Sequence, residues 1–349
     1  MFAVLIIIYL DVVAVSLYHS ILCNEACHYS LVRNRINAYQ YVHNIFRRNN
    51  YTTLDKWISK DPNFRPITYA IGDNIKWNNM SVCRNDSFFL LMYFVRKDDL
   101  ARRSVIREYV KQNMIVDGKK INYVFVVASP LNATNQIKEL TNENALYGDI
   151  LISLHEDNYR LVPITILDAF YWVREYCKTV SFVARIDGDV WVHLGNLIHY
   201  YKSLDERRVF SGIMQVVHSN GGAVWYKGIH NIPYDYSYPV KHVAGGAYVL
   251  SRDVVPFINI GANYMSVLLP ISEDVMITDI LSKAGIELHP CPPDYLLFTN
   301  TFGNIVFPNN TIFVHNAKSI ELFREIYSYH STVYITPFKQ YNLCSTNTP

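Results

Sequence analysis

Two aspartates stand one residue apart in the stretch V-S-F-V-A-R-I-D-G-D-V-W-V-H-L, residues 180–194. Side chains at i and i+2 of an extended segment point the same way, so Asp187 and Asp189 can face one cation. Gly188 between them lets the backbone turn and lets a ligand come close. Carboxylate oxygens suit Mg²⁺ and Mn²⁺. The pair is therefore a candidate metal site, although Asp-Gly-Asp is also a common composition for a plain turn.

A buried strand is predicted immediately before this pair. The apolar residues of 180–186 suit a strand that is covered on both faces. Such a strand cannot continue through two carboxylates, because burying an unpaired charge costs too much free energy. We therefore expect the strand to reach the surface at Ile186 and to present Asp187 and Asp189 at its carboxyl end.

The first half of the chain alternates between strands and helices. Apolar runs predict strands at 88–95, 121–128 and 149–154, and helical patterns occupy 98–113, 132–146 and the residues from Pro163 onward. Such alternation predicts an α/β fold with a mostly parallel sheet and helices on both faces. Ligands bind at the carboxyl ends of the strands in these sheets, where the aspartate pair lies. Further strands are expected at 208–217 and 244–250, and helices at 254–264 and 275–284.

The composition excludes some classes of function. The chain has 349 residues, of which 50% are hydrophobic, and its net charge is +2 with Lys and Arg scattered along it. This is enough to bury a substantial core, and without a basic stripe we expect no nucleic-acid partner. The six cysteines fit no zinc-binding spacing.

Residues 1–22 form an apolar segment that is interrupted only by Asp11 and is long enough to cross a bilayer. We expect a signal-anchor or a signal peptide, with the following residues lumenal or extracellular. Residues 23–86 are polar and are predicted to be a stem. Five glycosylation sequons support this location: Asn50, Asn79, Asn85, Asn132 and Asn309. Four cysteines could form disulfides there, in pairings that the sequence leaves open: Cys83, Cys177, Cys291 and Cys344.

Six stretches resemble, in the same order, the motifs of one enzyme family. The first three are A-R-R-S-V-I-R-E-Y (101–109), Y-G-D-I-L-I-S-L-H-E-D-N-Y (147–159) and F-V-A-R-I-D-G-D-V-W-V (182–192). The others are G-G-A-Y-V-L-S (245–251), S-E-D-V (272–275) and I-F-V-H-N-A-K (312–318). Over about residues 87–330 the chain resembles the β1,3-galactosyltransferase family, the inverting, Fringe-related group of hexosyltransferases.

The resemblance implies a catalytic domain at 87–345 with a GT-A-type, Rossmann-like fold. It also implies a UDP-sugar donor and Mn²⁺ (or Mg²⁺), held by three side chains: Asp187, Asp189 and His315. Inverting transfer needs a base that takes the proton of the acceptor hydroxyl. The family motif gives this role to Asp274, with Glu273 as the runner-up.

Other residues are candidates for binding the donor, and each has a structural alternative. Arg103 and Arg107 are four positions apart on a predicted helix and could lie near the nucleotide, or they could form a solvated basic face. Asp187 could also lie near the nucleotide. Gly245 and Gly246 could let the backbone approach the sugar, or could mark a tight strand entry. Equally, Glu273 and Asp274 could be an acidic pair at a helix start capped by Ser272, and His315 could be an ordinary histidine.

The implied function is transfer of a hexose, with galactose expected, from a UDP-sugar to a sugar hydroxyl in a β1,3 linkage. N-acetylglucosamine and N-acetylgalactosamine remain alternative donors. The acceptor would be a glycan on a glycoprotein or glycolipid, and the enzyme a single-pass type II protein of the Golgi membrane with a lumenal catalytic domain. Four departures from the family motifs, at Tyr109, Thr165, Gly188 and Thr278, leave open a rival function. The rival is a weakly active or inactive family member that binds carbohydrate in the lumen.

Overall fold

The structure is a computed structural model that describes residues 75–76, 80–83, 87–130, 132–217, 240–264, 272–291, 296–298 and 310–332. All of these residues belong to one compact unit, residues 63–349. The predicted signal segment 1–22, most of the predicted stem 23–86 and every sequon except Asn132, which is exposed, lie outside the described residues. Within the described ranges, no helix combines the length and the apolar character that a membrane span requires.

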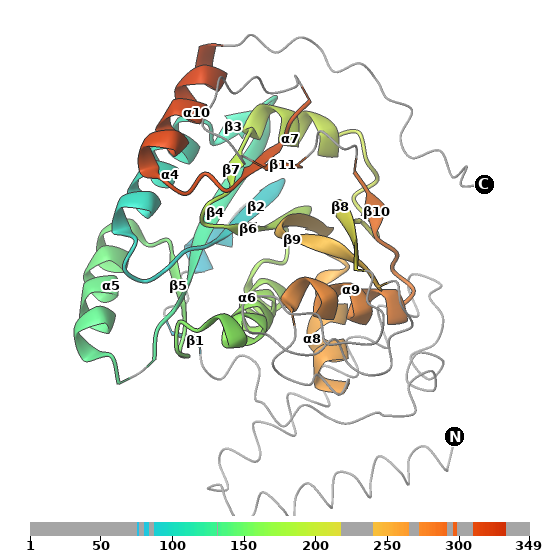
Figure 1. The fold of residues 1–349 in the computed structure, drawn as a ribbon, viewed down its shortest axis with the longest axis horizontal. Coiled ribbons are helices and arrows are strands. Elements are labelled where there is room, and N and C mark those ends of the chain that lie inside the picture. Colours follow the sequence, from blue (N-terminus) through green and yellow to red (C-terminus); the bar gives the residue numbers. More distant parts are fainter. Residues whose placement is uncertain are drawn as a thin grey trace, which may run out of the picture. The chain divides into compact units, whose positions relative to one another are not determined.

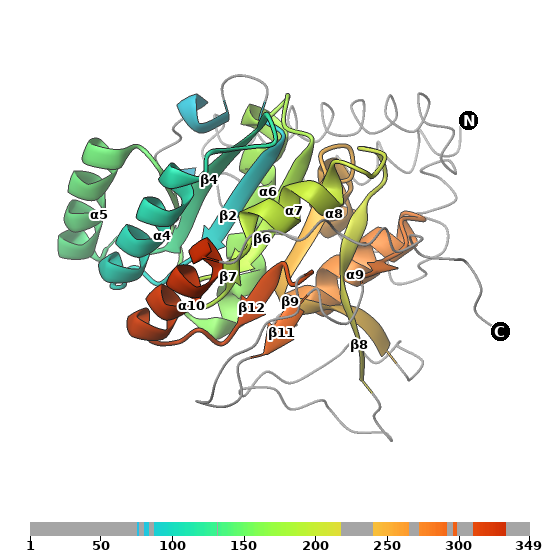
Figure 2. The same ribbon diagram turned by 90° about the horizontal axis from the view of Figure 1, so that it is seen from above.

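A mixed sheet forms the centre of this unit, with strand order β1-β5-β4-β2-β6-β9-β8-β10 and with β3 paired to β4 (Figures 1 and 2). Four neighbouring strands, β5, β4, β2 and β6, are parallel, as the sequence predicted. Beyond them β9 runs antiparallel to both β6 and β8, so the sheet is parallel only in part. The strands are β1 Ile75–Lys76, β2 Phe89–Phe94, β3 Ile115–Val116, β4 Lys119–Ala128, β5 Ile150–Ser153, β6 Phe182–Asp187, β8 Phe210–Val217, β9 Val240–Ser251 and β10 His289–Pro290.

Helices cover both faces of the sheet, which confirms the predicted α/β fold class. One face is packed against α4, α5, α7 and α10, whose buried residues join one hydrophobic cluster. The other face is covered by α6, α8 and α9, which contact one another. The helices are α4 Leu100–Gln112, α5 Thr134–Tyr147, α6 Val162–Tyr176, α7 Leu194–Tyr201, α8 Val255–Tyr264, α9 Glu273–Lys283 and α10 Ile320–Thr332.

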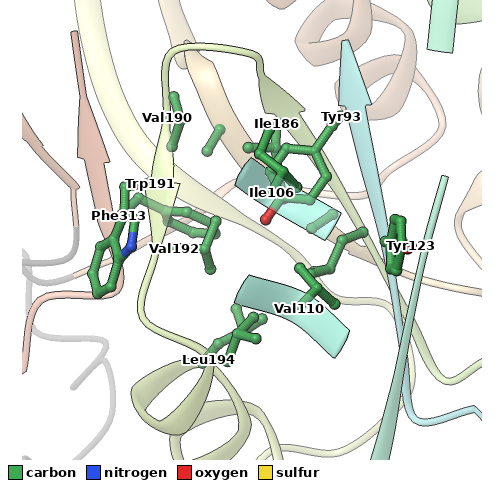
Figure 3. Close-up of a cluster of buried hydrophobic side chains, with 14 of the residues drawn as sticks. Tyr93, Ile106, Val110, Tyr123, Ile186, Val190, Trp191, Val192, Leu194 and Phe313 are labelled. Carbon is green, nitrogen blue, oxygen red and sulfur yellow. The ribbon is translucent and has the colours of Figure 1, made fainter. Parts of the chain in front are cut away.

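The alternation of side chains along β2 explains why its sequence is continuously apolar. Phe89, Leu91 and Tyr93 belong to the cluster under α4, part of which is drawn in Figure 3. Leu90 and Met92 are equally buried but lie on the opposite face. A strand that is covered on both faces has no solvated side on which polar residues could alternate.

A second, three-stranded sheet joins parts of the chain that are far apart in sequence. Its strand order is β11-β12-β7, with bounds Leu296–Phe298, Phe313–His315 and Trp191–Val192. β7 follows the Asp-Gly-Asp turn directly and pairs antiparallel with β12, which ends at His315. Elsewhere, a disulfide between Cys83 and Cys177 joins the 3-10 helix Met80–Cys83 to the end of α6. This disulfide settles one of the pairings that the sequence had left open.

Candidate active site

Three predicted metal ligands lie together at the carboxyl end of β6. The ligand atoms of Asp187, Asp189 and His315 are all within 4.8 Å of one another. Nε2 of His315 lies 3.4 Å from Oδ1 of Asp189 and 4.0 Å from Oδ2 of Asp187. Pairing of β7 with β12 brings the histidine there, because Val314 is opposite Trp191 in the register.

Asp189 is ionised, as a carboxylate that binds a metal must be. Burial alone would raise the pKa of Asp189, but the hydrogen bond and charge of His315 and the charge of Arg102 outweigh it, so this pKa is lowered. Asp189 therefore stays ionised at neutral pH. Two carboxylates with one imidazole are a donor set that suits Mn²⁺, since Mn²⁺ accepts both oxygen and imidazole ligands. The residues present thus fit the metal that the sequence implied.

Gly188 is needed because the turn lies against the neighbouring strand β2. Its N–H donates to the carbonyl of Phe94 over 2.9 Å. A Cβ added at this position would lie 3.0 Å from the same carbonyl oxygen and 3.3 Å from Val95. Gly188 therefore accommodates the close approach of β2, and the approach of a ligand to this turn stays a prediction.

Arg185, which was not predicted as a site residue, links the metal turn to α9. Its Nη2 lies 2.9 Å from Oδ1 of Asp187 and 2.9 Å from Oε1 of Glu273, and its side chain is only 4% exposed. The guanidinium also lies over the ring of Phe94, at 5.2 Å. Because Arg185 occupies Oδ1 of Asp187, the other oxygen of that carboxylate is left facing His315.

Glu273 is the more deeply buried of the two candidate bases. Burial first, and then the charges of Asp274 and Asp187, raise its pKa to about 8, against the opposing charge of Arg185. Arg185 itself stays charged, since the charge of Asp187 raises its pKa against the effect of burial. The hydroxyl of Tyr248 donates to Oε2 of Glu273 over 3.1 Å. Glu273 is thus held in place, and at neutral pH it is largely protonated.

Asp274 occupies a different environment at the start of α9. Its Oδ1 accepts from the backbone N–H of Val275 over 2.8 Å and from the hydroxyl of Ser272. Its Oδ2 lies 3.8 Å from Nε2 of His242, a buried histidine of β9 that was not predicted. Ser272 does occupy the N-cap position, but its side chain bonds to Asp274 rather than capping the helix.

The two glycines of β9 connect the candidate base to the metal ligands. A Cβ at Gly245 would lie 3.1 Å from Oδ2 of Asp274, and a Cβ at Gly246 would lie 2.8 Å from Nδ1 of His315. Consecutive residues of one strand thus contact the two groups. The structure therefore brings the Asp-Gly-Asp turn, the start of α9 and His315 into one site, as the motifs had predicted.

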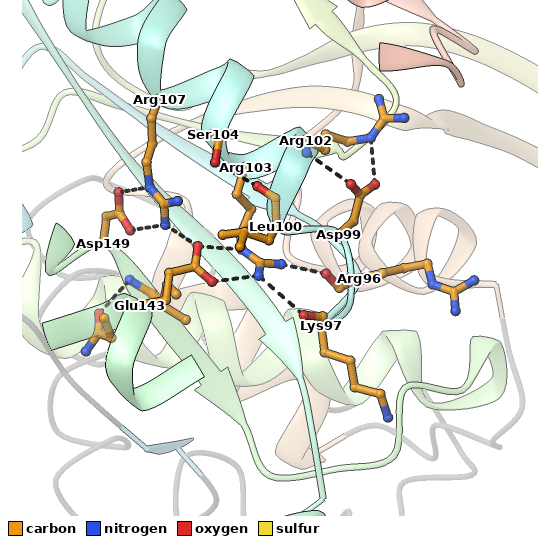
Figure 4. Close-up of polar contacts among 12 residues, drawn as sticks. Arg96, Lys97, Asp99, Leu100, Arg102, Arg103, Ser104, Arg107, Glu143 and Asp149 are labelled. Atoms are coloured by element: carbon orange, nitrogen blue, oxygen red, sulfur yellow. Dashed lines mark hydrogen bonds and ion pairs between the residues drawn. The ribbon is translucent and has the colours of Figure 1, made fainter. Parts of the chain in front are cut away.

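Arg103 and Arg107 lie in a buried polar cluster on α4 (Figure 4). Arg103 pairs with Glu143 at 2.7 Å, and Arg107 pairs with Glu143 at 2.6 Å and with Asp149 at 2.8 Å. The alternative of a solvated basic face is therefore wrong, because both side chains are almost fully buried. These ion pairs give the two arginines a structural role, and contact with a donor stays a prediction.

The sequence contains a signal for Arg185, although this residue was not predicted as part of the site. Arg185 is a charged residue within an apolar strand, two positions before Asp187 and hence on the same side of the strand. A buried charged residue needs a partner of opposite charge, so this position of Arg185 predicts a contact with a carboxylate of the site. No comparable signal marks His242, whose role depends on where α9 packs against β9.

Comparison with known proteins identifies one family model and several relatives that match this chain. A family model described as Galactosyltransferase matches residues 101–292. Lactosylceramide 1,3-N-acetyl-beta-D-glucosaminyltransferase from Xenopus tropicalis is 26% identical over 220 residues, which are 60% of this chain and 58% of that protein. UDP-GalNAc:beta-1,3-N-acetylgalactosaminyltransferase 1 from Rattus norvegicus is 27% identical over 223 residues, which are 62% of this chain and 65% of that protein. The matches thus span less than two thirds of each relative.

Two solved structures resemble the fold more distantly. The galactosyltransferase LgtC in complex with donor and acceptor sugar analogs has a TM-score of 0.39 and 13% identity, over 70% of this chain and 97% of that one. A glycosyltransferase involved in the glycosylation of the major capsid of PBCV-1 has a TM-score of 0.40 and 13% identity, over 69% and 99%. Similarities of this size identify no function, but the family model covers more than half of the chain, and the chain therefore belongs to the galactosyltransferase family.

Proposed function

We propose that this chain is an inverting hexosyltransferase that moves a sugar from a UDP-sugar to a hydroxyl of a glycan, in a β1,3 linkage. The observation that carries the proposal is the meeting of Asp187, Asp189 and His315 with the carboxylates at the start of α9. A metal site beside a candidate base is what metal-dependent inverting transfer from a nucleotide sugar uses. Membership of the galactosyltransferase family supports the same reaction.

Three side chains would hold Mn²⁺ or Mg²⁺: Asp187, Asp189 and His315. When bound, the cation neutralises the charge that grows on the diphosphate as the bond to the sugar breaks. Arg185 supports this site by holding Oδ1 of Asp187, which orients the carboxylate toward His315. The low pKa of Asp189 supplies an ionised ligand throughout the neutral range.

Asp274 is the proposed base that accepts the proton of the attacking hydroxyl. Glu273 is poorly suited to this role, since it is buried against Arg185 and Tyr248 and its pKa of about 8 keeps it largely protonated. Asp274 is more exposed, and its Oδ2 faces Gly245, where no side chain intervenes. Gly245 thus lets β9 lie directly against the Asp274 carboxylate, since a Cβ there would be only 3.1 Å from Oδ2.

The sugar and the cellular location belong to the same proposal. Galactose is the first donor to test. N-acetylglucosamine and N-acetylgalactosamine follow, because the names of the two relatives specify these two sugars. The acceptor would be a glycan of a glycoprotein or glycolipid. The Cys83–Cys177 disulfide supports a lumenal catalytic domain, since disulfides persist in oxidising compartments. Residues 1–22 would attach the enzyme to the Golgi membrane.

A transfer assay with mass detection of the product tests the proposal. The full chain is incubated with Mn²⁺, each of the three UDP-sugars and a panel of glycans terminating in galactose, glucose or N-acetylhexosamines. We expect a β1,3-linked product from one donor, and a loss in kcat of about 10²–10⁴-fold in Asp274→Asn. The matched control is Asp98→Asn, which removes an exposed carboxylate that pairs with Arg96 on the surface.

The rival carbohydrate-binding function predicts a different result. Glycan would then bind to the protein without release of UDP from any donor, and Asp274→Asn would bind glycan as the wild type does. That outcome would replace the transferase proposal with the rival.

A further inference from the structure

Arg102 makes contacts that differ from those of its neighbour Arg103. Its side chain is 9% exposed, and its Nε donates to Oδ2 of Asp99 over 3.0 Å. Nη1 donates to the carbonyl of Gly188 over 3.2 Å and to that of Ala317 over 2.9 Å. Nη2 donates to the carbonyl of Lys318. One guanidinium therefore contacts three backbone carbonyls and one carboxylate.

These carbonyls belong to the two segments that carry the metal ligands. Gly188 is the middle residue of the Asp-Gly-Asp turn, and Ala317 and Lys318 follow His315 by two and three residues. The segments also meet directly, because the backbone N–H of Ala317 donates to the carbonyl of Asp189 over 2.8 Å. Arg102 lies across this junction from the side of α4.

The position of Arg102 is itself fixed by the start of α4. Asp99 is the N-cap residue of the helix, and its Oδ1 accepts from the backbone N–H of Arg102 over 3.0 Å. The other oxygen of the same carboxylate holds Nε of Arg102. The guanidinium is therefore anchored on a rigid element before it reaches the two segments.

We propose that Arg102 is a positioning residue for the metal site, setting the separation between the Asp-Gly-Asp turn and the segment after His315. This inference rests on the proposed function, which assigns metal binding to Asp187, Asp189 and His315. Arg102 contacts backbone carbonyls beside these ligands, so its influence on the metal is indirect. Partners that orient metal ligands typically change metal affinity 10–100-fold when they are removed.

Arginine suits this position and lysine does not. A guanidinium presents five N–H donors in a planar fork and can bond to several acceptors in fixed directions. A lysine ammonium has one nitrogen, which cannot span the carbonyls of Gly188 and Lys318 while also bonding to Asp99. Arg102→Lys therefore keeps the charge and most of the volume but removes the bridge.

A purely structural role is the alternative, and Arg252 provides a matched control for it. Arg252 also bonds to two backbone carbonyls, those of Cys177 at 2.8 Å and Arg174 at 2.9 Å. Arg252 directly follows Ser251, the last residue of β9, which pairs with Phe182 at the start of β6. Asp187 lies at the other end of β6. Arg252→Lys should lower stability without affecting the metal site.

The test measures binding of Mn²⁺ alone to the full chain, by the electron paramagnetic resonance signal of the free ion, together with the Tm of each variant. We expect the dissociation constant for Mn²⁺ to rise about 10–100-fold in Arg102→Lys and to stay within about twofold of wild type in Arg252→Lys. Equal Mn²⁺ affinity in Arg102→Lys and wild type overturns the inference, as does equal weakening in the two variants.

Two further variants complete the test. Asp189→Ala separates the inference from the proposed function: if the wild type binds Mn²⁺ no better than Asp189→Ala, the metal site itself is wrong. If Arg102→Lys does not fold, Gly188→Ala probes the same junction, because its Cβ would lie 3.0 Å from the Phe94 carbonyl and 3.5 Å from Cδ of Arg102. Unchanged Mn²⁺ affinity in folded Gly188→Ala would then overturn the inference.

Discussion

Glu273 and Asp274 are adjacent carboxylates that have different environments. Glu273 points into the protein, where Arg185 and Tyr248 hold it, whereas Asp274 contacts Ser272 and the glycine-bearing strand β9. Their order in the sequence therefore says little about which of them accepts a proton. Burial and neighbouring charge decide this, because desolvation disfavours the charged form of a carboxyl group.

The raised pKa of Glu273 predicts a pH-dependent stability. This pKa is about 8 in the folded protein against an ordinary 4.5, so between these values the folded state binds a proton that the unfolded state has lost. The contribution of Glu273 to the free energy of unfolding is fully present below about pH 4.5 and is lost as the pH rises toward 8. Glu273→Gln has no carboxyl group to titrate and does not lose this stability. The Tm of Glu273→Gln minus that of the wild type should therefore increase from pH 5 to pH 8.

Differential scanning calorimetry of both proteins in EDTA checks this prediction. Other titrating groups contribute equally to the two proteins and largely cancel in the difference. A difference in Tm that is flat across this range, or that becomes smaller as the pH rises, would mean that Glu273 is ionised in the folded protein.

The candidate metal pair could be proposed from the sequence because two carboxylates follow an apolar strand, whereas Arg185 could not be assigned a role without its partner. Asp187 and Asp189 are separated by two positions at the end of an apolar strand, a local pattern. The contact between Arg185 and Glu273 joins residues that are 88 positions apart. Only the packing of α9 against β9 brings those residues together.

At the scale of elements, consecutive glycines of β9 lie against the proposed base Asp274 and the proposed metal ligand His315. In Gly246→Ala, the new Cβ would lie 2.8 Å from Nδ1 of His315, so the imidazole must move. In Gly245→Ala, the Cβ would instead lie 3.1 Å from Oδ2 of Asp274. We expect Gly246→Ala to weaken Mn²⁺ binding by tenfold or more, and Gly245→Ala to lower kcat while Mn²⁺ affinity stays within about twofold.

Each glycine variant serves as the control for the other, because both add one methyl group to the same strand. Calorimetric titration with Mn²⁺ and steady-state kinetics separate the two effects. If both variants lose Mn²⁺ affinity equally, it is wrong that Gly246 contacts His315 while Gly245 contacts Asp274 instead.

The parallel strands could be predicted from sequence, and the pairing of β7 with β12 could not. β2 is a continuous apolar run, and β4 and β6 are mostly apolar and buried, since both faces of these strands are covered. β7 and β12 have two and three residues, too few to show a periodicity, and Trp191 and Val314 pair across more than 120 positions. His315 was therefore found through a motif, and its place beside Asp189 came from the structure.

At the scale of the molecule, one disulfide closes a long stretch of chain. Cys83 and Cys177 are 94 positions apart, and their bond joins the segment before β2 to the end of α6. Closing a loop of this length restricts the unfolded chain and stabilises the folded state by about 2–5 kcal/mol. The paired variant Cys83→Ser with Cys177→Ser should lose this amount.

Urea unfolding of the paired variant and of the wild type, followed by fluorescence, measures that loss. The same wild-type protein unfolded with and without a reductant is the control, since reduction should reproduce the effect of the two substitutions. An unchanged midpoint in both comparisons would show that the disulfide does not form in the protein.

The central claim is that one divalent cation binds between the Asp-Gly-Asp turn and His315, beside Asp274. Crystals of the protein grown with Mn²⁺ and UDP, with diffraction measured at the manganese absorption edge, test it most directly. We predict a single anomalous peak within bonding distance of Asp187, Asp189 and Nε2 of His315, with the diphosphate beside it. A manganese peak elsewhere, or UDP bound with no metal between these residues, would contradict the claim.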